Sequence, residues 1–72
     1  MRLTRHARNR LRWIAKSHPR VTAQALAQSL PKAKTMGYDD RGNRKVQLVF
    51  GEARLTVVVD DAARVVVTVW VE

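Results

Sequence analysis

The hydrophobic pattern of this 72-residue chain changes its period once, and that change constrains the fold more than any other feature. Up to Pro31, apolar residues recur every three to four positions, as they do on one face of a helix. From residue 33 to residue 71 they alternate with other residues, as in a strand with one buried face. A chain this short forms one domain, so we expect residues 1–72 to fold as a unit. The pattern predicts an α+β fold with two N-terminal helices packed on a four-stranded antiparallel β-sheet.

The first predicted helix, residues 3–16 with Thr4 as N-cap, separates apolar from basic side chains. Its apolar stripe, which must face a core, consists of Leu3, Ala7, Leu11 and Ile14. The opposite face carries Arg5, Arg8, Arg12 and Lys16. A flank between the two contains His6, Arg10, Trp13 and Ser17. Side chains on such a flank can be anchored by packing and still reach a ligand, although Trp13 can also be interpreted as a cap on the core.

The second predicted helix begins at Thr22, a good N-cap, with Val21 and Leu26 spaced as a hydrophobic staple. It ends at Leu30-Pro31, because proline cannot continue a helix. We expect its core side to consist of Ala23, Leu26, Ala27 and Leu30. The two helices should form a hairpin joined by a turn at residues 18–20.

Strands are predicted around residues 33–38, 45–50, 54–59 and 64–71, separated by turn-rich segments. In the last strand we expect Val65, Val67, Val69 and Val71 to share the core face. The outer sheet face then collects Lys45, Gln47, Val49, Arg54, Thr56, Val58, Arg64, Val66, Thr68 and Trp70. This face is too polar for a second core and too apolar for an idle surface. It indicates a binding surface, and its valines leave room for a homodimer.

The net charge of +8 is concentrated in the helical half of the chain. Residues 1–38 hold nine Lys or Arg and no Asp or Glu, whereas residues 39–72 hold five basic and six acidic residues, giving +9 and −1. Such an unneutralised field favours a polyanion, either a nucleic acid or an acidic protein that masks the surface. A membrane surface fits less well, since the apolar stripe lacks the bulky aromatic residues of an interfacial helix.

Composition argues against several other classes of site. Without cysteine there is no disulfide or thiolate chemistry, and two histidines without clustered acids predict no metal site. We expect no cofactor. The longest apolar run, Val65–Val71, contains Thr68 and is far shorter than a bilayer span, and residues 1–20 lack the apolar core of a signal peptide. We therefore expect a cytoplasmic protein that does not enter a membrane.

Several short segments resemble, in their order and spacing, a family of small uncharacterised domains. They are Leu3-Thr-Arg-His-Ala-x-x-Arg10, the staple of the second helix, the turn at residues 40–42, Leu55-Thr-Val-Val-Val-Asp60 and Val67-Thr-Val-Trp70. That family is grouped with the barnase, EndoU, colicin D and RelE ribonuclease-toxin superfamily, and the resemblance covers nearly the whole chain. It implies a RelE/barnase-like fold and metal-independent RNA cleavage by attack of the ribose 2′-OH on the adjacent phosphorus.

The resemblance also implies roles for particular residues. His6 would be the acid–base group, Arg10 would hold the phosphate, and Thr68 with Trp70 would line the sheet side of a catalytic site. The chain departs from the family pattern, because no carboxylate lies near His6 in sequence and a tryptophan stands where a smaller aromatic residue is expected. RelE-type toxins work without the usual acid–base pair. A toxin-like protein would also have an acidic antitoxin or immunity protein as partner.

We expect RNA as the partner, contacted by Arg5, Arg8, Arg12, Lys16, Lys45, Arg54 and Trp70. Plainer interpretations stand beside this one. A lone histidine on a helix flank is more often a packing residue than a catalyst, and a row of arginines can be a solvated face. Trp70 can seal the sheet edge or stack on a base. The alternative function is therefore a non-catalytic RNA-binding or protein-binding module of the same fold, which leaves enzymatic activity open.

Overall fold

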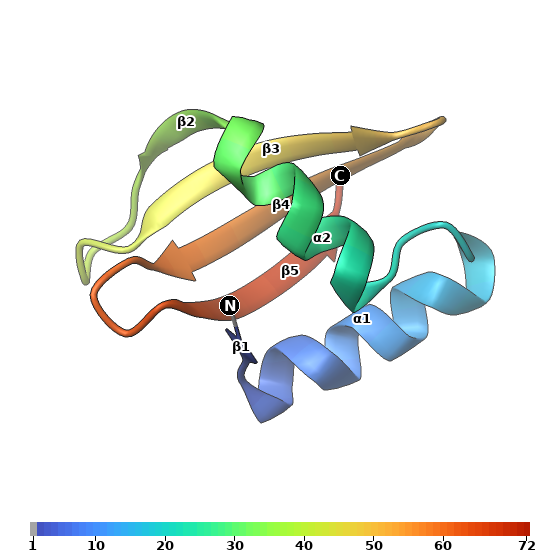
Figure 1. The fold of residues 1–72 in the computed structure, drawn as a ribbon, viewed down its shortest axis with the longest axis horizontal. Helices are drawn as coiled ribbons and strands as arrows, with labels where there is room; N and C mark the ends of the chain where they lie inside the picture. The colour runs from blue at the N-terminus through green and yellow to red at the C-terminus, as the bar shows by residue number, and fades with distance from the viewer. Residues whose placement is uncertain (1) are drawn as a thin grey trace.

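A computed structural model describes residues 2–72 of the chain. The elements in order are β1 (Arg2–Leu3), α1 (Arg5–Ser17), α2 (Ala23–Ser29), the 3₁₀ turn η1 (Leu30–Lys32), β2 (Lys34–Tyr38), β3 (Arg44–Phe50), β4 (Ala53–Asp60) and β5 (Val65–Val71). α2 crosses one face of the sheet, and α1 packs along the side formed by β5 (Figure 1). The predicted α+β class, with two helices on a sheet, is confirmed.

The sheet has five strands in the order β1-β5-β4-β3-β2, and not the four that we expected. β2 to β5 form the predicted antiparallel meander. The additional strand, β1, runs parallel to the start of β5, with Arg2 beside Val65 and Leu3 beside Val66. Because β1 is parallel to β5 and the other strands are antiparallel, the sheet is mixed. The sequence did not predict β1, since two residues are too few to show an alternating pattern and their partners lie at the other end of the chain.

Both helices have the predicted threonine caps, but α1 begins at Arg5, so the predicted helix start at residue 3 was wrong and Leu3 lies in β1. The Thr4 Oγ1 atom accepts a hydrogen bond from the backbone N–H three residues later at 3.0 Å, and Thr22 Oγ1 does the same at 3.0 Å. Such bonds satisfy backbone donors that have no partner within a helix. The staple residues Val21 and Leu26 are both fully buried. The cap and staple residues were therefore sufficient to predict where each helix is capped.

The core lies between the helices and the inner face of the sheet. Its members include Ala7, Leu11, Ile14, Val21, Leu26, Leu30, Val46, Leu48, Leu55, Val57, Val59, Val66 and Val69. In α2 only Leu26 is buried, whereas Ala23 and Ala27 are exposed, so our assignment of these alanines to the core was wrong. α2 has seven residues and contacts the core through Leu26, while Leu30, one turn later in η1, is buried beside it. The smaller alanines beside them remain outside.

The last strand departs from strict alternation. β5 pairs with β4 at Val66 and again at Thr68, which leaves Val67 as the extra residue of a β-bulge. Val66 therefore turns into the core and is 1% exposed, while Val65 and Val67 are half-buried. The predicted core positions of Val65 and Val67, and the outer position of Val66, were wrong. Val69 is in the core as predicted.

The bulge is tied to the start of α1. The Thr4 N–H donates to the Val66 carbonyl at 3.0 Å, and the Thr4 hydroxyl donates to the Val67 carbonyl at 2.8 Å. The same hydroxyl oxygen caps α1. One threonine thus joins the first helix to the last strand and positions α1 at the edge of β5. Because these contacts connect opposite ends of the chain, no local pattern could predict the bulge.

Candidate nucleic-acid interface

α1 carries a row of exposed basic side chains on the side away from the core. Arg5, Arg8 and Arg12 are exposed and, together with Asn9, line a hollow of about 440 Å³. The helix contains no acidic residue. Like charges three and four residues apart on a helix destabilise it by roughly 0.2–0.5 kcal/mol per pair. An anion bound in this hollow would relieve the repulsion.

The only ion pair within residues 2–72 lies outside α1. Arg44 contacts Asp61 through two hydrogen bonds, from Nε to Oδ2 and from Nη2 to Oδ1, each 3.0 Å long. Hydrogen bonding to Asp61 raises the pKa of the Arg44 guanidinium. The five Lys and Arg residues of α1 have no carboxylate partner in this part of the chain. Their charge is therefore available to an external anion.

Trp13 extends the basic face and does not cap the core. Its side chain is 68% exposed, and the Lys16 Nζ atom lies 4.3 Å from the centroid of its ring. An exposed indole beside cationic groups can stack on a nucleobase. We did not include Trp13 among the predicted binding residues. The signal was present, because Trp13 lies off the buried stripe formed by Ala7, Leu11 and Ile14.

Arg10 reaches the edge of the sheet. Its Nε atom donates a hydrogen bond to the Val69 carbonyl of β5 at 3.4 Å. β1 pairs only with Val65 and Val66, so the later part of this β5 edge can be approached by α1. The flank of the first helix thus lies along the sheet edge, as a site shared by α1 and β5 requires.

His6 and Thr68 are the other two predicted catalytic residues. His6 is exposed on α1, one turn before Arg10, and the half-buried Thr68 is the β5 neighbour of Val69. Thr68 pairs with Val58 of β4 on the outer sheet face. Arg10 therefore connects the helix of His6 to the strand of Thr68. The convergence of all three side chains on one phosphate stays a prediction.

The remaining predicted binding residues lie on the outer sheet face. Strand pairing places Lys45, Gln47, Arg54, Thr56, Thr68 and Trp70 there. Arg54 is exposed, whereas Lys45 and Trp70 are half-buried. The Thr56 hydroxyl donates a hydrogen bond to the Glu72 carboxylate, which brings an acidic group to this face. The outer face is therefore a second surface, distinct from α1 and less favourable to phosphates.

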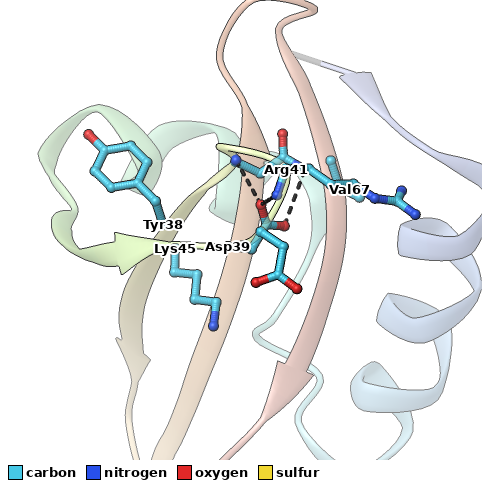
Figure 2. Close-up of a pocket in the computed structure, with 7 residues that line it drawn as sticks. Tyr38, Asp39, Arg41, Lys45 and Val67 are labelled. Atoms are coloured by element: carbon cyan, nitrogen blue, oxygen red, sulfur yellow. Dashed lines mark hydrogen bonds between the residues drawn. The ribbon is translucent and has the colours of Figure 1, made fainter.

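A hollow of about 350 Å³ opens at the β2–β3 turn, and acidic and basic residues line it together with Lys45 (Figure 2). Its lining consists of Tyr38, Asp39, Asp40, Arg41, Asn43, Lys45 and Val67. Asp39 Oδ1 accepts hydrogen bonds from the backbone N–H of Asn43 at 2.8 Å and of Arg41 at 2.9 Å. Both bonds lower the pKa of Asp39, and the bond from Asn43 has the larger effect. The carboxylate shapes the turn, and the mixed charges make this hollow a weaker phosphate site than α1.

Other kinds of site receive no support from the part of the chain that the structure describes. Residues 2–72 contain no group of three or more His, Cys, Asp or Glu side chains placed to hold a metal ion. None of their helices is long and apolar enough to cross a membrane. Compared with protein families, curated proteins and solved structures, the chain shows no match. The functional argument therefore depends on the residues themselves.

Proposed function

We propose that the protein binds RNA through α1 and the adjoining edge of β5, and that it is a metal-independent endoribonuclease. The basic face of α1 carries this proposal, because its five Lys and Arg residues have no carboxylate partner within residues 2–72. Each phosphate that such a surface neutralises releases condensed counterions, which drives binding to a nucleic acid. The helix is about 20 Å long, at 1.5 Å per residue, so several phosphates can contact it together.

The aromatic residues favour single-stranded RNA as the substrate. Trp13 is exposed beside Lys16, and Trp70 is half-buried on the outer sheet face. Stacking on such rings contributes about 1–3 kcal/mol per base and needs bases that are not paired in a helix. In this proposal Lys45 and Arg54 contact RNA that extends past the β5 edge onto the outer face.

In the proposed reaction, the neutral imidazole of His6 takes the proton of the ribose 2′-OH. The 2′-oxygen bonds to the adjacent phosphorus and the P–O5′ bond breaks. The 5′-oxygen leaves as a hydroxyl after taking a proton from water, and the proton on His6 returns to solvent. Arg10 stabilises the negative charge on the phosphate oxygens, since its bond to Val69 uses one of its five N–H donors. The products are a 2′,3′-cyclic phosphate and a 5′-hydroxyl.

The resemblance of the His6-Ala-x-x-Arg10 segment to domains of the barnase, EndoU, colicin D and RelE superfamily supports these roles. Two helices that precede an antiparallel meander also fit a RelE/barnase-like fold. An enzyme that cleaves cellular RNA as a toxin acts in the cytoplasm, which is the location that we propose. The Arg10 contact supports the position of the site, since it brings the helix flank to the strand of Thr68.

Incubation of the purified protein with total RNA in the presence of a chelator tests this proposal. We expect new RNA ends that carry 2′,3′-cyclic phosphate. His6→Ala and Arg10→Ala should each abolish these ends while RNA binding persists. His18→Ala is the matched control, because His18 is half-buried at the C-cap of α1, at the opposite end of the helix from His6.

Three results would overturn parts of the proposal. Salt-sensitive RNA binding without cleavage would leave the non-catalytic RNA-binding module as the function. Absence of RNA binding at low salt would remove the role of α1 as well. Cleavage that His18→Ala reduces as much as His6→Ala would take the catalytic role away from His6.

A further inference from the structure

Asn9 is a neutral residue in the middle of the exposed side of α1. At about 100° per residue, it lies opposite the buried stripe of Ala7, Leu11 and Ile14, so it faces directly outward. Its side chain is exposed, and that of Arg5, one turn earlier, lies on the same outward side. An amide adds no charge to a surface that attracts phosphates. It can donate and accept hydrogen bonds together, which suits the edge of a nucleobase.

Arginines flank Asn9 on both sides of the helix. On the side towards α2, Arg8 and Arg12 line a groove of about 340 Å³ that α1 shares with the start of α2. On the side towards β5, Arg10 donates a hydrogen bond to the Val69 carbonyl at 3.4 Å, and its other N–H groups can bind a phosphate. α1 therefore has two lines of positive charge with an uncharged hydrogen-bonding residue between them.

The cationic surface continues past both ends of α1. At the start of the helix, the Arg2 N–H donates to the Arg64 carbonyl at 3.2 Å, which joins β1 to the turn between β4 and β5. Both side chains are exposed, as is that of Arg20 in the turn after α1. α1 itself forms one boundary of the molecule (Figure 1). A long polyanion can therefore follow the whole helix.

We propose that the outward side of α1 enters the major groove of double-stranded DNA and that Asn9 reads a base there. A helix with its side chains is about 10–12 Å across, and the major groove of B-DNA is about 12 Å wide. Base edges in that groove lie between two phosphate backbones. Arg8 and Arg12 contact one backbone and Arg10 the other, whereas a single strand offers only one. Double-stranded RNA does not fit, because side chains cannot read its deep and narrow major groove.

The chemistry of Asn9 indicates which base it reads. In the major groove, an asparagine amide pairs with adenine by donating to N7 and accepting from the N6 amino group. Guanine offers two acceptors there, O6 and N7, which an arginine such as Arg5 matches. The recognised sequence therefore contains adenine beside guanine. This binding does not require that the protein cleave RNA, although the two nucleic acids compete for α1.

Selection from a library of random DNA duplexes, followed by sequencing, tests the proposal. We expect an enriched duplex that contains adenine and binds about tenfold more tightly than a scrambled duplex of the same composition, as one bidentate base contact provides. The same two sequences as double-stranded RNA should bind equally to each other. Fluorescence anisotropy measures all four affinities at one salt concentration, because salt sets the contribution of the phosphates.

A cycle of two substitutions assigns the base contact to Asn9. 7-Deazaadenine, which lacks the N7 acceptor, replaces each enriched adenine in turn and at one position should weaken wild-type binding by about fivefold. Asn9→Ala should abolish the tenfold preference, and 7-deazaadenine should then have no further effect. Asn9→Ala keeps every charge, so its affinity for single-stranded RNA should stay near that of the wild type.

Gln28→Ala is the matched control for Asn9→Ala. Gln28 carries the same amide group, is exposed on α2, and lines neither the groove nor the hollow of α1. This variant should keep the preference for the enriched duplex. Circular dichroism checks that both variants keep the wild-type fold.

Several results would overturn the proposal. Equal binding of the enriched and scrambled duplexes would show that α1 attracts DNA by charge alone. A preference that survives Asn9→Ala, or that Gln28→Ala also abolishes, would place base reading elsewhere. An equal preference in double-stranded RNA would exclude the major groove. The proposed function fails separately, because a DNA preference lost in Asn9→Ala supports the inference even if RNA is not cleaved, and RNA cleavage without a DNA preference leaves only the ribonuclease.

Discussion

α1 and the antiparallel meander β2–β5 use their charged residues in different ways. In the meander, Arg44 pairs with Asp61, Asp39 shapes the β2–β3 turn, and the Glu72 carboxylate accepts a bond from Thr56. In α1, five Lys and Arg residues have no such carboxylate partner within residues 2–72. These four charged residues of the meander, Arg44, Asp61, Asp39 and Glu72, thus serve the fold itself. Those of α1 oppose helix formation by mutual repulsion, and an external anion is the natural partner for them.

This difference divides α1 into two functional sides. Its buried side, with Ala7, Leu11 and Ile14, belongs to the core. Its exposed side contributes little to stability, so residues there can be replaced without unfolding the protein. Substitutions on the buried side of α1 should therefore lower the free energy of unfolding, whereas substitutions on the exposed side should change binding and leave stability nearly unchanged. The experiments below test this division and the contrast with the meander.

The largest effect should come from the buried side of α1. Leu11 is 7% exposed, and Leu11→Ala removes part of a core that is small in a domain of this size. We expect a loss of about 2–5 kcal/mol in the free energy of unfolding, from lost apolar burial and the cavity left behind. Urea titration followed by circular dichroism measures it. His6→Ala, on the exposed flank, should change stability little, and an equal loss would identify His6 as a core residue.

The next effect concerns the exposed side and is seen in binding. Each phosphate contact with single-stranded RNA contributes about 0.7 to the slope of log affinity against log salt, so Arg8→Gln with Arg12→Gln should lower this slope by about 1.4. At 0.1 M salt that corresponds to roughly 25-fold weaker binding. Filter binding over a range of salt concentrations measures the slope. Arg44→Gln removes a charge that the fold already uses, so it should leave the slope unchanged.

An unchanged slope in the double variant would show that the basic face of α1 does not contact RNA. A lower slope in Arg44→Gln of the same size would mean that net charge matters and position does not. Either result would end the contrast between α1 and the meander. The unfolding free energy of the double variant should stay close to that of the wild type, because Arg8 and Arg12 are both exposed.

A smaller loss of stability should follow from Thr4→Ala, where the two regions are joined. The substitution removes the N-cap of α1 and the hydroxyl bond to the Val67 carbonyl at the β5 bulge. We expect a loss of about 1–2 kcal/mol in the free energy of unfolding. Thr4→Ser keeps the hydroxyl and is the control, which should retain most of the stability. Equal losses in both variants would show that the methyl group, and not the hydrogen bonds, stabilises this junction.

The parts of the fold that were predicted correctly depend on signals within a few residues. The caps at Thr4 and Thr22, the staple of Val21 with Leu26 and the tight Gly51-Glu52 turn are of this kind. Gly51 has φ of 63°, which favours glycine, and the strands on either side of the turn pair through Phe50 and Ala53. The alternation in β3 and β4 also predicted the burial of Val46, Leu48, Leu55, Val57 and Val59, but Val58, which was predicted on the outer face, is buried as well at 4% exposure.

The parts that were missed depend on contacts between distant segments. β1 is recognisable only from its pairing with β5, and the bulge at Val67 only from its bond to Thr4. The basic face of α1 could be predicted from residue spacing, since one helix is enough to form it. The groove between α1 and α2 could not, because Leu11 and Ala23 come together only when the two helices pack. Surfaces built by a single element are therefore more accessible to sequence analysis than those built between elements.

The smallest effect should separate the regions by pH. Asp39 accepts turn hydrogen bonds from Asn43 and Arg41, which lower its pKa from the ordinary value of 3.8. A carboxyl whose pKa is lower in the folded state stabilises the protein above the unfolded pKa, and this contribution disappears as the pH falls through the folded pKa. Stability should therefore decrease below about pH 4 partly through Asp39. Asp39→Asn removes the titrating group, so stability should fall less steeply between about pH 4 and pH 2.5. The difference in slope should correspond to a fraction of one proton taken up on unfolding. Asp40→Asn, in the same turn, is the control and should keep the steeper wild-type dependence. Urea titrations at a series of pH values measure how steeply stability depends on pH. Identical slopes in the wild type and Asp39→Asn would mean that the turn does not depend on this carboxylate. Asp39 would then no longer count among the charges that stabilise the meander.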